Sequence, residues 1–238
     1  MTPGFATIGQ GTDVGAWRDH NEDALRVNAD AGLLIVADGM GGHAAGEVAS
    51  RITVDTIEAA VAGEGVGLGE AIARAHANVV AAAEDGRGYA GMGTTCVACR
   101  LGADGVELAW VGDSRAYRYR GGELEPLTRD HSYVQSLVDA GLLAAERAES
   151  HPDRHILARC VGGGDLEPGD VDAVVLPAQA GDRILLCSDG LTGELSEAWI
   201  AGILSVYPDD QEAVDELLRS AVAAGGHDNV TAIVATVG

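Results

Sequence analysis

Acidic side chains follow two apolar runs of this sequence in the same way. Residues 34–37 read Leu-Ile-Val-Ala and residues 185–188 read Leu-Leu-Cys-Ser, and each run ends abruptly in Asp-Gly, at Asp38 and Asp189. Short apolar runs of this kind are typical of strands that are buried on both faces. A carboxylate at the end of such a strand is costly unless something compensates its charge. An Asp-Gly pair can simply form a turn, but two matched copies favour a chemical role.

Further acids stand at comparable positions along the chain. Glu22 and Asp23 precede a β-like stretch. Asp113 lies in a Gly-Asp-Ser break between two apolar strands, and Asp228 precedes the last strand. Carboxylates that gather at one place raise each other's pKa values, and a hard divalent cation resolves this conflict. Because oxygen-only ligation favours Mg²⁺, Mn²⁺ or Ca²⁺ over Zn²⁺, the residues predict a site for a hard divalent metal.

Composition and charge restrict the class of protein. Of the 238 residues 47% are hydrophobic and 22% charged, which fits a folded chain and excludes a disordered one. The 15 basic and 37 acidic side chains give a net charge of −22, which argues against partners such as nucleic acid or an anionic membrane surface. No stretch reaches the ~20 apolar residues of a membrane span, and no signal-peptide pattern opens the chain. We therefore expect a cytoplasmic protein.

The four cysteines are too few for a disulfide scaffold, so reduced thiols are expected. Cys96 and Cys99 form a CxxC pair inside a predicted strand. Side chains alternate between the two faces of a strand, so this pair is expected to point to opposite faces and to be structural. No second CxxC completes a zinc site.

Strand and helix patterns occur in blocks instead of in strict alternation. Helices are predicted over residues 45–61, 69–85, 197–207 and 212–224. Strands are predicted over residues 5–8, 24–28, 33–37, 94–101, 106–111, 115–120, 123–127, 171–176, 184–188 and 229–237. A polar segment rich in His and Arg, about residues 130–162, holds one helix-like piece at 132–140. This order favours one domain with a mostly antiparallel β core and helices packed outside it.

Six motifs then occur in a fixed order: Arg18-x-x-Asn-Glu22-Asp23, Val36-Ala37-Asp38-Gly39-Met40-Gly41-Gly42-His43, Gly91-Met-Gly93-Thr94-Thr95, Gly112-Asp113-Ser114-Arg115, Ser188-Asp189-Gly190 and Asp228-Asn229-Val230-Thr231. This set resembles the PPM-type (protein phosphatase 2C) Ser/Thr phosphatases, and its Asp-Gly-Met-Gly-Gly-His form resembles the short bacterial members. The resemblance covers essentially the whole chain. It implies an α+β fold, a four-layer αββα sandwich of two central antiparallel β-sheets flanked by helix pairs. It also implies a single catalytic domain over residues 1–238, with a flap at about 130–162.

The resemblance further implies roles for individual residues. Asp38 would bridge two metal ions, Mn²⁺ or Mg²⁺, and the Gly39 carbonyl would ligate one of them. Asp189 and Asp228 would hold the other ion, and Asp113 would add a ligand to a third, weaker one. Glu22 and Asp23 would orient metal-bound water, and Arg18 would bind the substrate phosphate. A metal-bridging hydroxide would attack phosphoserine or phosphothreonine directly. Without the resemblance, Arg18 could be a solvated side chain, and Glu22 and Asp23 could cap a turn.

One position departs from many eukaryotic relatives, in which a histidine follows Asp-Gly and is the proposed general acid. Met40 occupies that position here and cannot donate a proton. His43, His131 and His155 are nearby candidates without a secure claim, and metal-bound water could protonate the leaving group instead. His155 falls where the resemblance implies a flap residue with a hydroxyl group. Whether the flap takes part in metal binding therefore stays open.

Two rival functions stay open at this point. Residues 39–44 also fit the dinucleotide fingerprint GxGxxA, with Glu58 about twenty residues further on. Alternatively, the chain could be a non-catalytic relative that binds phosphoproteins. The preferred expectation is a monomeric phosphatase that acts on phosphorylated proteins, with a Ser/Thr protein kinase and its substrates as partners. We expect its regulation to come from separate proteins or to be absent.

Overall fold

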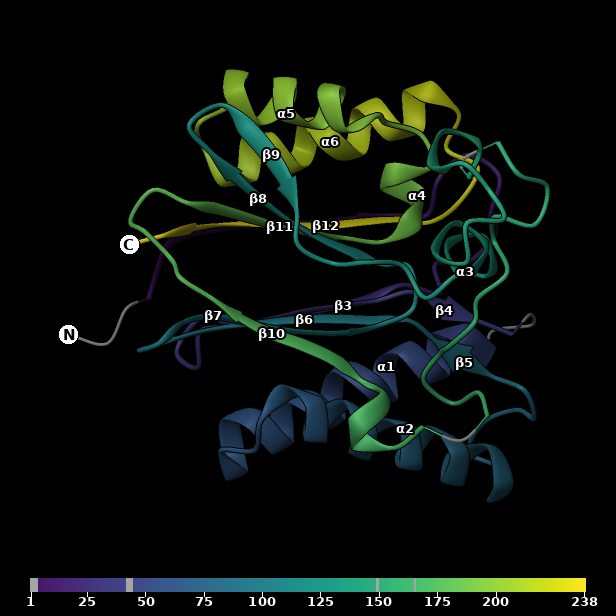
Figure 1. Ribbon diagram of the computed structural model, residues 1–238. Coiled ribbons are helices and arrows are strands. Elements are labelled where there is room, and N and C mark those ends of the chain that lie inside the picture. Colours follow the sequence, from purple (N-terminus) through teal and green to yellow (C-terminus); the bar gives the residue numbers. More distant parts are fainter. Residues whose placement is uncertain (1–3, 42–44, 149, 165) are drawn as a thin grey trace.

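The computed structural model describes residues 4–41, 45–148, 150–164 and 166–238. Two five-stranded antiparallel sheets lie face to face at its centre (Figure 1). The first sheet has the strand order β1 (Phe5–Asp13), β12 (Val230–Val237), β11 (Arg183–Cys187), β8 (Arg115–Arg120) and β9 (Glu123–Pro126). The second has the order β10 (Asp172–Leu176), β7 (Gly105–Val111), β6 (Cys96–Gly102), β3 (Leu33–Ala37) and β2 (Ala24–Asn28). The short strands β4 (Gly39–Met40) and β5 (Gly93–Thr94) pair separately.

Helices cover the outer face of each sheet. The second sheet carries α1 (Ala45–Glu58), which continues in the π-helical turn η1 (Ala59–Gly63), and α2 (Leu68–Glu84) (Figure 1). The first sheet carries α4 (Asp189–Thr192), α5 (Glu197–Val206) and α6 (Asp210–Ala224). The segment between β9 and β10 contains α3 (Tyr133–Asp139) and the 3₁₀ turns η2 (Ala145–Arg147) and η3 (Pro168–Asp170). The expected four-layer αββα sandwich is confirmed.

The apolar runs form central strands because each has a partner layer on both sides. In β3, Leu34 and Val36 pack between the two sheets, whereas Leu33 and Ile35 pack against the layer of α1 and α2. All five residues of this strand are inaccessible to solvent. The strand β11 alternates in the same way, with Ile184 and Leu186 between the sheets. Each fully buried side chain of this size contributes roughly 1.5–3 kcal/mol, which offsets the cost of ordering the strand.

The CxxC prediction is confirmed by the same alternation. Cys96 belongs to the cluster below α1 and α2, and Cys99 belongs to the cluster between the sheets. Both are free thiols. Burial raises their pKa values above the ordinary range, so neither is suited to be a thiolate ligand or nucleophile.

A buried ion pair joins the first sheet to its helices. Arg183 Nε at the start of β11 donates to Asp210 Oδ1 at the start of α6, over 2.9 Å, and both side chains are almost fully buried. The other Asp210 oxygen accepts from the Thr7 hydroxyl and from the Thr236 N–H. Asp209 caps α6 by accepting from the backbone N–H groups of Gln211 and Glu212, which explains why this helix begins two residues before the predicted start.

The predicted strand over residues 94–101 is interrupted at its start. Thr95 donates its backbone N–H to Asp38 O, and Thr94 donates its own to Val161 O, so β6 begins only at Cys96. This detour ties the start of β6 to the residue that follows β3. Among the described residues, no helix has both the length and the apolar character needed to cross a membrane.

Candidate active site

The predicted acids meet at one end of the sandwich. Asp38 follows β3, Asp113 lies between β7 and β8, and Asp189 follows β11. Asp228 joins them because β11 and β12 are antiparallel neighbours, with Cys187 opposite Ala232, so the end of one strand and the start of the other share a sheet edge. A cleft of about 580 Å³ is lined by the predicted residues Arg18, Glu22, Asp38, Gly39, Asp113, Asp189 and Asp228.

Backbone hydrogen bonds hold Asp38 at the end of β3. Its N–H donates to Thr95 Oγ1 (3.0 Å), and its carbonyl accepts from Thr94 Oγ1 (2.8 Å). Gly39 follows with its N–H on the carbonyl of Glu22. A Cβ on Gly39 would lie 2.3 Å from Gly46 O and 2.4 Å from Glu22 O, so only glycine fits here.

Asp23 is anchored beneath the cleft by two hydroxyl groups. Its Oδ2 accepts from Ser188 Oγ (2.9 Å) and from Thr231 Oγ1 (2.6 Å). Its Oδ1 is buried and has no hydrogen-bond partner among the described residues. A buried carboxylate oxygen without a donor is costly. A water held by a cation would supply the missing donor.

The segment 14–23 brings Arg18 to the cluster by packing against the segment 225–229. Asn229 Nδ2 donates to the carbonyls of Val14 and His20, and its Oδ1 accepts from the Glu22 N–H. Gly15 has φ +77° and approaches the Asp228 carbonyl so closely that a Cβ would lie 2.2 Å from it. As a result, Arg18 Nη2 donates to Asp228 Oδ2 over 2.6 Å.

The four central carboxyl groups resist ionisation in the absence of a cation. Burial raises the pKa of Asp38 well above its usual range, and the charges of Asp23 and Asp189 raise it further. Burial raises the pKa of Asp23 to about 7 and that of Asp113 to about 8, with added repulsion from Asp189. The pKa of Asp189 is raised by burial and by Asp228. A divalent cation would reverse these shifts because it favours the charged form of every carboxylate.

The donor set fits a hard divalent cation that keeps water in its shell. Most of the side chains of the cleft that could bind a metal are carboxylates, and the unpaired oxygen of Asp23 fits a bound water. Within the described ranges, no three His, Cys, Asp or Glu side chains already surround one point as a closed metal cage. Asp228 Oδ2 is engaged by Arg18, so this oxygen would have to leave the guanidinium before it could contact an ion.

The histidines have different surroundings. His131 accepts the Gly112 N–H at Nδ1, so its Nε2 carries the proton and donates to Asp172, over 3.1 Å. It therefore supports the turn that carries Asp113. His155 lines the cleft, with Nδ1 4.0 Å from Asp189 Oδ2. His43 lies outside the described residues. Met40 lines the cleft, as its place in the sequence implied.

Several residues of the site were not singled out from the sequence. Thr95, Ser188 and Thr231 stand inside the quoted motifs, but their roles follow from contacts made across the fold. Glu194 and His227 line the cleft as a hydrogen-bonded pair, with Glu194 Oε1 2.7 Å from His227 Nδ1, and Arg154 of the flap segment also lines it. No local pattern marks these three residues.

The dinucleotide alternative does not fit the topology. The strand that follows β3 and α1 and pairs with β3 is β6, and this pair is antiparallel, whereas the fingerprint needs a parallel βαβ unit. Glu58 is occupied by Arg26 and Asn28.

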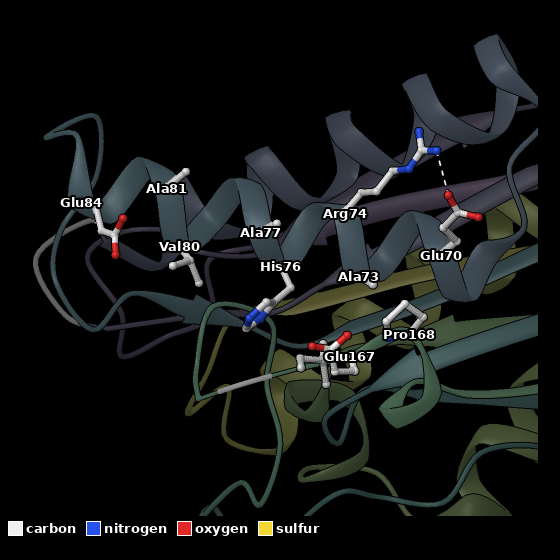
Figure 2. Close-up of a pocket in the computed structure, with 11 residues that line it drawn as sticks. Glu70, Ala73, Arg74, His76, Ala77, Val80, Ala81, Glu84, Glu167 and Pro168 are labelled. Carbon is white, nitrogen blue, oxygen red and sulfur yellow. Dashed lines mark hydrogen bonds and ion pairs between the residues drawn. The ribbon is translucent and has the colours of Figure 1, made fainter.

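A second pocket, of about 570 Å³, lies along α2 and is also lined by Leu166, Glu167 and Pro168 (Figure 2). Figure 2 shows Arg74 paired with Glu70 on this helix, and the two charged atoms are 2.7 Å apart. His76 points into the same region, and its Nδ1 accepts the Gly162 N–H. The acids of this pocket, Glu70 and Glu84 of α2 and Glu167 at the start of η3, do not follow buried strands, so the pocket lacks the arrangement of the cleft.

Comparisons with known proteins agree with the geometry. The family model described as protein phosphatase 2C matches residues 13–226 of this chain. The Ser/Thr protein phosphatase PstP of Mycobacterium tuberculosis is 40% identical over 231 residues, which are 95% of this chain and 44% of that protein, so the chain spans less than half of this relative. The Ser/Thr phosphatase stp of Listeria innocua is 39% identical over 236 residues, 94% of this chain and 92% of that protein.

A solved structure supports the same assignment. The crystal structure of the catalytic domain of PstP in complex with two manganese ions has a TM-score of 0.87 and 35% identity to this chain. The match covers 100% of this chain and 99% of that one. Sequence, fold and the position of the acid cluster lead to one conclusion: this chain belongs to the protein phosphatase 2C family.

Proposed function

We propose that this chain is a metal-dependent phosphatase that hydrolyses phosphoserine and phosphothreonine on proteins. The observation that carries the proposal is the convergence of Asp38, Asp189 and Asp228 in one cleft with Arg18, although they are far apart in the sequence. The relatives named as Ser/Thr protein phosphatases support the same substrate class.

Asp38, the Gly39 carbonyl, Asp189 and Asp228 would hold two divalent ions, Mn²⁺ or Mg²⁺, and Asp113 would contribute to a third, weaker site. When bound, such ions supply an activated water and neutralise charge on the phosphate. The manganese in the PstP structure supports Mn²⁺ as the first ion to try.

The residues of the chain orient the reactants. Arg18 donates one hydrogen bond from Nη2 to Asp228, and the other N–H groups of its planar guanidinium can donate to phosphate oxygens. The unpaired Oδ1 of Asp23 can accept a proton of the attacking water, and Glu22 lies on the same cleft. Met40 cannot act as a proton donor, so a water molecule would protonate the leaving alkoxide.

The test is hydrolysis of p-nitrophenyl phosphate and of a phosphothreonine peptide by the purified protein with Mn²⁺. We expect turnover of both substrates that EDTA abolishes and Mn²⁺ restores. If folded protein turned over neither substrate at any Mn²⁺ or Mg²⁺ concentration, the non-catalytic phosphoprotein-binding function would replace this one.

The same proposal extends to the domain organisation, the cellular setting, the oligomeric state and the partners of the protein. We propose one catalytic domain over residues 1–238, with a flap at about 130–162 whose Arg154 and His155 border the cleft. The free thiols Cys96, Cys99 and Cys187 favour a reducing, cytoplasmic setting. A monomer and a partner Ser/Thr kinase complete the proposal. Size-exclusion chromatography and a phosphoproteome comparison with and without the protein test these two points.

A further inference from the structure

Trp17 is a large aromatic residue that the fold leaves in solvent. It precedes Arg18 on the segment 14–23, and 72% of its surface is exposed. Burial of such a ring stabilises most folds, so an exposed tryptophan contributes little to the core here. Its position beside the proposed phosphate-binding residue gives it another use.

The Trp17 ring is fixed in place although it is exposed. Its Nε1–H donates to the Gly225 carbonyl over 3.2 Å. The indole stacks on the His227 imidazole, with ring centroids 5.7 Å apart and planes 10° from parallel. His227 is in turn held by Glu194, whose Oε1 lies 2.7 Å from Nδ1 and also accepts the His227 backbone N–H. A ring held in this way loses little conformational entropy when a ligand binds to it.

The stack extends the wall of the cleft outward. Glu194 and His227 line the cleft together with Arg18 and Asp228. Trp17 and Arg18 both contact the segment 225–228, at Gly225 and His227 in one case and at Asp228 in the other. A phosphopeptide whose phosphate lies against Arg18 would therefore run past the stacked rings of Trp17 and His227.

Charge indicates which side chain this wall would prefer. The face of an indole attracts cations, more strongly than the rings of Tyr or Phe. The surroundings are acidic as well, since the protein carries a net charge of −22 and the Glu194 carboxylate lies beside His227 of the stack. Both effects favour an arginine or lysine over an acidic residue.

We propose that Trp17 is a specificity-determining residue, which binds an arginine or lysine that flanks the phosphorylated residue of the substrate. The inference rests on the proposed phosphatase function and adds to it a preference for basic phosphorylation sites. Trp17 takes no part in the hydrolysis itself, so a substrate without a peptide should not respond to its removal.

The test compares phosphothreonine peptides that differ at one flanking position, which holds either arginine or citrulline, its uncharged analogue of nearly the same shape. Each position within three residues of the phosphothreonine is scanned in turn. The kcat/KM values are measured with Mn²⁺ for the wild type, Trp17→Ala and Trp17→Phe. Trp199→Ala, which removes a 61% exposed tryptophan on α5, is the matched control. The measurements are made at high salt, which screens the general attraction between the acidic protein and a basic peptide.

For the wild type we expect an arginine-to-citrulline ratio of about 3 to 10 at one position or more. Trp17→Ala should bring this ratio close to 1, Trp17→Phe should retain part of it, and Trp199→Ala should leave it unchanged. Hydrolysis of p-nitrophenyl phosphate should be the same in all four proteins.

Three results would overturn the inference. The first is an equal ratio in the wild type and Trp17→Ala, and the second is an equal loss of peptide and p-nitrophenyl phosphate turnover in Trp17→Ala. The third is an arginine-to-citrulline ratio close to 1 in the wild type at every scanned position, which would show that the wall has no preference for a cation. Absence of p-nitrophenyl phosphate turnover in the wild type would instead overturn the phosphatase function, and this inference with it.

Discussion

Replacing Arg18 with alanine separates the proposed role of this residue in phosphate binding from its role in the fold. Its side chain is 48% exposed and its partner Asp228 is 35% exposed. An ion pair this open to solvent contributes about 1 kcal/mol or less to stability. For a protein of this size, that loss lowers Tm by no more than about 4 °C.

The expected effect on activity is much larger. Charge-assisted hydrogen bonds to a phosphate are worth about 1.5–3 kcal/mol, which corresponds to a loss of about 10- to 150-fold in kcat/KM. Arg18 would hold the phosphate both before and during the reaction, so most of this loss should appear as a higher KM. Arg18→Lys should fall between the wild type and alanine, because an ammonium keeps the charge but not the planar fork.

The assay measures initial rates over a range of p-nitrophenyl phosphate concentrations, at several Mn²⁺ concentrations. Arg18→Ala frees Asp228 from its ion pair, so the Mn²⁺ concentration for half-maximal rate should not rise. Arg51→Ala, which breaks an exposed ion pair with Glu47 on α1, is the control for a lost surface charge. The reasoning fails if kcat/KM of Arg18→Ala stays within about threefold of the wild type. It also fails if excess Mn²⁺ restores the lost rate.

Three further predictions concern the acid cluster and the core. Asp38→Asn should abolish Mn²⁺-dependent turnover but raise Tm in EDTA, because burial and the neighbouring acids oppose ionisation of the Asp38 carboxyl and the amide has no such cost; a lower Tm in EDTA would contradict this. Asp23 and Asp113 have pKa values of about 7 and about 8 in the folded protein, above the ordinary 3.8, so the folded state binds their protons more tightly. Their contribution to stability is therefore lost as the pH rises from 3.8 through about 8. Tm in EDTA should fall between about pH 5 and about pH 8, and Mn²⁺ should suppress this decline. A Tm that rises over this range would show that the pKa values of Asp23 and Asp113 are not raised. Asp210→Ala should lower the free energy of unfolding in urea by about 3–5 kcal/mol, because it leaves the buried Arg183 cation without its partner. Asp215→Ala, on the exposed side of α6, should lower it by about 0.5 kcal/mol or less. Equal effects of the two substitutions would show that the buried ion pair does not stabilise the protein.

Local sequence pattern was enough to find the strands that carry the acids. The run at residues 33–37 is β3 as predicted, because a strand between two layers must be apolar at every position. The same rule located β11, one residue earlier than expected. The position of an Asp directly after each run follows from the sequence as well, and so does the chemistry of hard oxygen donors.

Which distant segments meet was decided by the tertiary structure. Arg18 reaches Asp228 across 210 positions only because Asn229 and Gly15 join two loops. Periodicity records which face of an element is buried, but it contains no information about which loop lies beside another. The sequence pattern did not show that β11 pairs with β12, so only the structure could place Asp189 and Asp228 at the same edge of the sheet.

The stack of Trp17 on His227 shows the same division most clearly. The sequence alone presents an aromatic residue in a polar segment and a histidine near the end of the chain, with nothing to connect them. Packing of the loop after β1 against the loop before β12 places the rings together, and Glu194 from a third segment orients one of them. Residue types are a local property and define the available chemistry, whereas contacts between loops depend on the packing of the whole sandwich.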